Sequence, residues 1–190
     1  MWNGFATTVT ARLVNGLLVQ AGVDRGSLTL DTCDLRAALP ETAPVNPYCH
    51  TEEPATQFKM LGAYTIPRIA LQVSATLQSL PGPDLAANFT ATSASIAPSL
   101  GRNLAAGAGA TVSVNLVEPG TLYGQRLNQL DLRLARVIRF GGASATLNLD
   151  LYNALNVDTV LTASTAYATW QRPQSIMLAR FAKLGLQLDF

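Results

Sequence analysis

The sequence lacks a run of apolar residues long enough to cross a membrane as a helix. Such a helix needs roughly 18 consecutive apolar residues. The most apolar stretch, LAAGAGATVSVNLV at 104–117, is glycine-rich and broken by Ser113 and Asn115. Yet apolar residues form 48% of the chain, and its mean hydropathy is positive. This hydrophobicity is spread over many short segments, which excludes a disordered chain and is high for a soluble domain.

Charged residues are also scarce, at 13% of the chain, and their net charge is only +1. That balance gives no electrostatic basis for binding nucleic acid. There is one histidine, His50, so a serine–histidine hydrolytic triad is not expected. We therefore predict no enzymatic activity and no cofactor.

Residue types that hold metals gather in one polar, proline-rich segment. A zinc site needs three or four convergent ligands, and the carboxylates here match the spacing of no calcium loop. We favour solvated loop residues over a zinc or calcium site and predict no bound metal. The residues concerned are Asp31, Asp34, Cys49, His50, Glu52 and Glu53.

The chain has only two cysteines, Cys33 and Cys49, and both lie in this segment. A disulfide between them would close a loop of a length that contributes about 3 kcal/mol of stability. It would also require an oxidising compartment. We favour the disulfide over the alternative of two free thiols.

The dominant pattern is alternation of apolar and polar residues, which indicates β-strands. In 143–155, for example, Leu147, Leu149 and Leu151 alternate with Thr146, Asn148 and Asp150. No segment has a convincing helical pattern. We expect seven long strands, and a minor hairpin within 80–125. The long strands are expected at 5–13, 17–30, 57–65, 69–77, 127–140, 143–155 and 175–190.

The connections between these strands alternate between short and long. The short ones are Asn15-Gly16, expected to form a type I′ turn, the link at Pro67, and Gly141-Gly142. The long ones are 31–56, 80–125 and 156–174. Transmembrane β-barrels have short periplasmic turns and long extracellular loops, and their strands are apolar outside and polar inside. We therefore predict an all-β, antiparallel, up-and-down transmembrane β-barrel segment.

Charged residues follow the same alternation. Asp131, Arg133 and Asp150 fall on the polar side of neighbouring strands. We interpret them as a lumen-facing ion-pair ladder that holds the wall and packs against a plug, in preference to direct substrate contacts. Arg136 and Arg180 fall on the apolar side, where charge is tolerated only near a membrane interface.

The aromatic residues fit two girdles, one at each rim of a barrel. The alternative is that they form the core of a soluble β protein. The girdle interpretation places Trp2, Phe58, Tyr152 and Trp170 near the outer rim, and Tyr64, Phe140 and Phe190 near the inner rim.

The last residues, KLGLQLDF, resemble the β-signal of bacterial outer-membrane proteins. The signal is carried by a polar residue, a glycine two positions later, and apolar residues third and fifth after that glycine: Lys183, Gly185, Leu188 and Phe190. The resemblance implies that the barrel-assembly machinery reads this strand. A terminal strand suits that role because its free edge can pair with another sheet.

Other segments resemble the closing strands of TonB-dependent outer-membrane receptors. LNQLDLRLARVIRFGG at 127–142, followed by ATLNLDLYNALN at 145–156, is similar to their last hairpin, and WQRPQSIMLARFAKLGLQLDF to their closing strand. LPGP and APSLGRNLAAG are similar to loops of receptors with an N-terminal carboxypeptidase-regulatory-like domain. The resemblance covers essentially the whole chain. It implies active uptake of a small molecule or oligomer, such as a siderophore or glycan, with specificity in loops such as 31–57 and 81–125.

The chain differs from these receptors in what it lacks. It shows no plug domain, TonB box or signal peptide, and seven strands is an odd number for a bacterial barrel. We expect residues 1–190 to be a single partial barrel, the C-terminal part of one with about 22 strands, and Met1 to be an internal methionine or the start of a truncated gene. The expected location is the bacterial outer membrane. Expected partners are lipid, the assembly machinery and the missing strands and plug, with TonB acting only through the absent part. The alternative is a small standalone outer-membrane porin-like or adhesin-like barrel, or a soluble β-barrel that binds a ligand.

Overall fold

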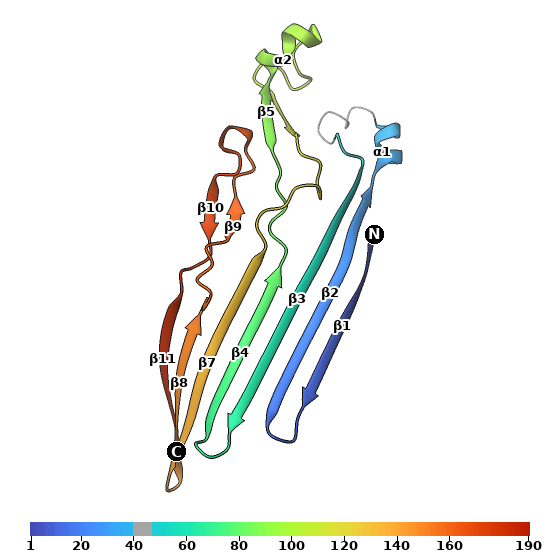
Figure 1. Cartoon of the computed structure of the whole chain (residues 1–190). Coiled ribbons are helices and arrows are strands. Elements are labelled where there is room, and N and C mark those ends of the chain that lie inside the picture. Colours follow the sequence, from blue (N-terminus) through green and yellow to red (C-terminus); the bar gives the residue numbers. More distant parts are fainter. Residues whose placement is uncertain (40–46) are drawn as a thin grey trace.

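The computed structural model describes residues 1–39 and 47–190. Seven long strands form one antiparallel sheet in the order β1-β2-β3-β4-β7-β8-β11 (Figure 1). The chain runs up and down, so neighbours in the sheet also follow one another along the chain. The two exceptions are β4–β7 and β8–β11, where a short hairpin lies between the paired strands. The strands are β1 (Trp2–Arg12), β2 (Leu17–Asp31), β3 (His50–Ile66), β4 (Leu71–Leu80), β7 (Leu127–Phe140), β8 (Ala143–Tyr152) and β11 (Phe181–Asp189).

The prediction of an all-β, antiparallel, seven-stranded architecture is confirmed, with β8 and the last strand shorter than expected and β3 longer. The last strand was predicted to run from 175, but it begins at Phe181. Before it, the N–H of Met177 donates to the carbonyl of Thr159, and the N–H of Arg180 donates to Asn156 Oδ1 at 3.0 Å. These backbone groups bond to a loop, so they are not available to the main sheet.

Two short hairpins lie beyond the long strands, at their loop end (Figure 1). The hairpin expected within 80–125 is formed by β5 (Asn88–Thr92) and β6 (Thr111–Asn115). A second, which alternation did not reveal, is formed by β9 (Val160–Ala163) and β10 (Pro173–Ile176). The two contact each other through the N–H of Asn88, which donates to Thr165 O at 2.6 Å.

The prediction that the chain has no helix is wrong. The described residues include α1 (Cys33–Ala38), α2 (Ser93–Leu100) and the short 3₁₀ helix η2 (Tyr167–Thr169). At the start of α2, the Thr92 side chain accepts from the Ser95 N–H and the Ser95 side chain accepts from the Thr92 N–H, a capping box. Gly101, with φ of 72°, ends it. Helices this short hold too few turns to create a detectable 3.6-residue pattern.

The first turn also differs from the expected type I′ geometry, which needs positive φ at both central residues. Only Gly16, with φ of 84°, is left-handed in this turn; Asn15 is not. The Gly16 N–H donates to Leu13 O at 3.0 Å, and the Leu13 N–H donates to Leu17 O at 2.8 Å. The hairpin therefore has a longer loop closed by a left-handed glycine.

The register gives the sheet one apolar and one polar face. Side chains alternate along each strand, and paired residues share a face. One apolar row crosses six strands, and the next row, on the opposite face, is mostly polar. The first row is Leu17, Tyr64, Val73, Leu134, Leu149 and Leu184, and the second is Leu18, Ala63, Ser74, Arg133, Asp150 and Lys183.

Neither face is covered by another layer, so the fold has almost no core. Ala87 and Ala145 are the only apolar residues of the described chain that are buried. The accessible surface is 12658 Å², against about 8,700 Å² expected for a compact monomer of this mass. Large apolar side chains such as Leu149 and Leu184 stay exposed. The hydrophobic effect acts on this face only if something other than water covers it.

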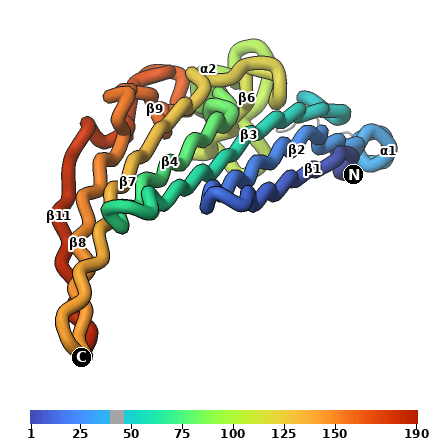
Figure 2. Tube along the Cα trace, turned by 60° about the horizontal axis from the view of Figure 1, so that its bottom comes forward, coloured from blue at the N-terminus to red at the C-terminus, as the bar shows by residue number. Residues whose placement is uncertain are grey.

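The sheet is open. Its edges are β1 and β11, which are not paired with each other. The sheet curves, and the two termini lie at its opposite edges (Figure 2). Among the described residues no helix is long and apolar enough to span a membrane.

Candidate functional site on the polar face

The polar face carries an ion pair between β7 and β8. Arg133 on β7 lies opposite Asp150 on β8, and Asp150 lies opposite Lys183 on β11. The Arg133 guanidinium donates from Nε to Asp150 Oδ1 and from Nη2 to Oδ2 at 3.1 Å. The Asp150 side chain is 8% exposed, whereas that of Arg133 is 51% exposed. One guanidinium thus holds both oxygens of the carboxylate, while the guanidinium itself still faces the open polar side of the sheet.

Asp131 shares this face but does not join the ion pair. Its carboxylate accepts from Gln129 Nε2 at 2.9 Å and from the backbone N–H of Asn153 at 2.8 Å. The continuous ladder of Asp131, Arg133 and Asp150 expected from the sequence is therefore two separate units. Asp131 fixes the end of β8, and Arg133 and Asp150 link the middle of β7 and β8.

Asn153 is a structural residue that the sequence reasoning missed. It is 1% exposed and has a φ of 50°. Its side-chain amide donates to Val157 O and Leu178 O, both at 2.8 Å, and its Oδ1 accepts from the Val157 N–H at 3.0 Å. These bonds join the end of β8 to the segment that enters β11. The available signal was an asparagine directly after a strand, since asparagine tolerates positive φ.

A shallow hollow of about 260 Å³ surrounds these groups on the polar face. Hydroxyl groups of Ser74 and Thr76 line it beside Asp131, Arg133 and Asp150. No set of three histidine, cysteine or acidic residues able to hold a metal occurs within 1–39 and 47–190. The donors and acceptors here suit contact with a polar ligand or polypeptide.

Two of the expected girdle aromatics lie on the polar face. Tyr152 stacks on Phe181, with ring centroids 4.7 Å apart, and both follow the parity of Asp150. Trp2 follows the parity of Gly4 and Gly26, and its indole occupies the space above Gly26. Trp170 lies in the loop after η2. Three other girdle aromatics lie on the apolar face: Phe58, Tyr64 and Phe140. Phe190, at the end of the chain, continues the alternation of β11 on that face.

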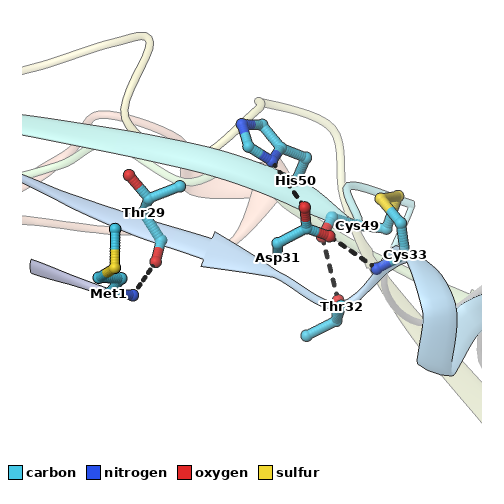
Figure 3. Close-up of polar contacts among 7 residues, drawn as sticks. All are labelled: Met1, Thr29, Asp31, Thr32, Cys33, Cys49 and His50. Atoms are coloured by element: carbon cyan, nitrogen blue, oxygen red, sulfur yellow. Dashed lines mark hydrogen bonds and ion pairs between the residues drawn. A yellow bond between two sulfur atoms is a disulfide. The ribbon is translucent and has the colours of Figure 1, made fainter.

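At the loop end of the sheet, a disulfide joins Cys33 to Cys49, with Cα atoms 4.7 Å apart. It closes the base of the long loop between β2 and β3 (Figure 3). Next to it, the Thr32 N–H and Oγ1 both donate to Cys49 O, at 2.7 and 3.2 Å. Of the loop 31–57 expected to contribute specificity, residues 40–46 lie outside the described part.

Asp31 is the polar centre of this loop base. It accepts from the Cys33 N–H at 3.0 Å and contacts His50 Nδ1 at 3.4 Å (Figure 3). The Cys33 N–H and, next, His50 lower the pKa of Asp31 below its usual range. Nearby, Glu52 accepts from Ser27 Oγ at 3.0 Å. Of the acidic residues weighed as calcium ligands, Asp31 and Glu52 thus make separate protein contacts.

The residues of the C-terminal signal lie on an edge strand. Lys183 and Gly185 face the polar side opposite Asp150 and Asn148. Leu188 lies on the apolar side, and Phe190 at the chain end is 98% exposed. One edge of β11 pairs with β8, and the other is free for a further strand.

The two arginines predicted on the apolar side differ in their surroundings. Arg136 lies on the apolar face of β7, paired with Leu71 and Leu147. Arg180 precedes β11, and its guanidinium donates to Ala154 O at 3.4 Å. Arg180 is thus a loop residue rather than part of the apolar face.

The other loop expected to contribute specificity, 81–125, holds β5, β6 and α2. Its Phe89 contacts Tyr167 of the neighbouring loop edge-to-face, with ring centroids 5.6 Å apart. The two loops therefore form one joined surface beyond the sheet.

The chain matches no protein-family model, no curated protein and no solved structure.

Replacing Asn153 with alanine should loosen the junction between β8 and β11. The variant loses three side-chain hydrogen bonds and places alanine at a left-handed φ. We expect a local loss of about 3 kcal/mol, which is roughly a hundredfold faster amide exchange near Val157 and Leu178. Asn148→Ala, within β8, is the control. Equal exchange in both variants would contradict the role of Asn153.

The loop base should weaken in acid. Because folding lowers the pKa of Asp31, its contribution is present above the ordinary carboxyl pKa of about 3.9 and is lost as pH falls through the lower folded value. Amide exchange at Cys33, corrected for intrinsic rates, should therefore show less protection at about pH 2 than at about pH 5. Asp31→Asn should remove that pH dependence, and its persistence in the variant would assign it to another group.

Proposed function

We propose that this chain is part of the wall of a bacterial outer-membrane β-barrel, with its apolar face toward lipid and its polar face toward the lumen. The observation that carries the proposal is the continuous apolar face across the seven-stranded sheet, which no other part of the described chain covers. A soluble sheet with one polar face buries the other against a second layer. In a membrane, lipid takes the place of that layer.

The size of the apolar face supports this proposal. On β7 it extends from Leu130 to Phe140, with Arg136 as the one charged residue in it, a length of roughly 33 Å along the strand. At the tilt of about 40° usual for barrel strands, this spans about 25 Å, the height of the apolar band of outer-membrane barrels. Toward the loop end of β3, beyond Phe58, the same face becomes polar at Thr56 and Glu52. The disulfide on that side suits an oxidising compartment.

The directions of the edge strands support a larger barrel. The strands alternate in direction, so with seven of them β1 and β11 run the same way. Closing the sheet on itself would require a parallel pair. An all-antiparallel barrel needs an odd number of additional strands between β11 and β1, which gives the even total of bacterial single-chain barrels.

Within this class, we propose a TonB-dependent receptor that takes up a small molecule or oligomer. Support comes from the motifs at 127–142 and 145–156 and from the terminal signal, which ends on a strand with a free edge. In this role β11 is read by the assembly machinery, and the joined loops around Phe89 and Tyr167 contribute to the ligand surface. The chain supplies wall and binding surface rather than catalysis.

Neighbouring residues of β8 should face different solvents in a bilayer. A spin label at Leu149→Cys should be relaxed by oxygen, which dissolves in lipid, and one at Asn148→Cys by a water-soluble nickel chelate, because the two residues point to opposite faces. The native cysteines are joined to each other and do not react. Electron paramagnetic resonance measures both relaxations. Equal accessibility of the two labels, or the reverse pattern, would rule out a lipid-facing apolar side.

The chain alone should not form a closed barrel, because its edge strands are parallel to each other. Expressed behind a signal peptide, it should give no fast-migrating species that unfolds on boiling, and the unprotected edges should lead to aggregation or degradation. Membrane fractionation and gel mobility with and without heating measure this. A compact, protease-resistant species in the outer membrane would favour a small standalone barrel.

A further inference from the structure

The apolar face is not uniformly filled. A hollow of about 350 Å³ lies over β3 and β4, bordered by Leu17, Tyr64 and Val73. It exists because Gly62 and its partner Ala75 have almost no side chain. A Cβ added to Gly62 would meet no atom within 4 Å. The hollow is therefore open space on the surface proposed to face lipid.

An unpaired cation lies beside this hollow. Arg136 pairs in register with Leu71, which follows Val73 on the same face toward the β3–β4 turn. Arg136 makes no hydrogen bond or ion pair within the described part of the chain. Apart from it, the apolar face carries no charge between the rows of Phe58 and Ile66. An arginine in such surroundings is costly unless an anion accompanies it.

Along the strands, Arg136 and the hollow follow each other as the phosphate headgroup and the acyl chain do in a phospholipid. Arg136 is opposite the last residue pair before the turn, Ile66 and Leu71, and the hollow lies farther from that turn. The turn itself carries a second cation, Arg68. Going from the turn toward the loops, the order is therefore Arg68 in the turn, Arg136 on the apolar face, and then the hollow.

We propose that this face binds a glycerophospholipid, with an acyl chain in the hollow over Gly62 and the phosphate on Arg136, assisted by Arg68. This proposal rests on the proposed function, since only a lipid-facing surface meets such a ligand. The guanidinium suits phosphate because it donates two parallel hydrogen bonds. A second protein segment would fill the hollow but would not neutralise Arg136 unless it carried an anion at the same place.

The test compares two lipids on the full chain in micelles of an uncharged detergent. Phosphatidylglycerol and the diacylglycerol with the same acyl chains differ only in the phosphate headgroup. Native mass spectrometry gives the lipid concentration at which half of the protein retains one molecule. The wild type should retain phosphatidylglycerol at a concentration about tenfold lower or more, the difference expected from one charge-assisted hydrogen bond.

Variants separate the headgroup from the acyl-chain contact. Arg136→Leu should remove the preference for phosphatidylglycerol, and Arg136→Lys should retain part of it. Gly62→Leu places a side chain in the hollow, where its Cβ meets no atom within 4 Å, and should weaken retention of both lipids by a similar factor. Arg139→Leu, three residues along β7 on the polar face, is the control and should bind as the wild type does.

The spin-label measurement on the same micelles distinguishes the two proposals. If the labels at positions 148 and 149 do not differ, the proposed function fails and the lipid site fails with it. If the labels differ as expected but the wild type retains both lipids equally, the lipid site alone is overturned. The same holds if Arg136→Leu keeps the wild-type preference.

Discussion

The physical constraint on which this structure depends is that one whole face of its main sheet is apolar and has no protein layer against it. Register maintains that uniformity: a slip of one residue in any strand would move its leucines to the polar face and its charges to the apolar one. The short turns therefore matter beyond their length. Gly16 and Gly141, both with positive φ, close hairpins that hold β1 against β2 and β7 against β8 in the register that separates the faces.

On the polar face, the strands are joined by different interactions. Its strands gain little from hydrophobic burial, so specific pairs join them: Arg133 with Asp150 across β7 and β8, and Gln78 with Gln129, at 2.7 Å, across β4 and β7. Such pairs would add little on a surface exposed to bulk water. In a narrow, partly filled lumen they would be screened less, and they would leave polar groups available for whatever occupies it.

Much of the sheet followed from the sequence, because alternation and the face it defines are local properties. Leu147, Leu149 and Leu151 reveal a strand without knowledge of its partners. Features set by tertiary contacts did not follow. Asn153 acts through the carbonyl groups of Val157, in the loop that follows it, and of Leu178, 25 residues away. Tyr152 was expected in the aromatic girdle at the outer rim, but it lies on the same face as Asp150 and stacks on Phe181. The short helices α1 and α2 have too few residues for periodicity to reveal them.

Two arginines on the apolar face are exceptions to its pattern, and they occupy different places along the strands. Arg25 is on the apolar side at the loop end, in the row of Phe5 and Thr56, whereas Arg136 is level with the β3–β4 turn. On β7 the same face continues beyond Arg136 to Phe140, so this arginine has apolar residues on both sides along the strand. The neighbouring row of Val73, Leu134 and Leu149 carries no charge. Of these two arginines, Arg25 thus lies at the loop end of the face, whereas Arg136 interrupts the face where β3 and β4 end and β7 and β8 continue.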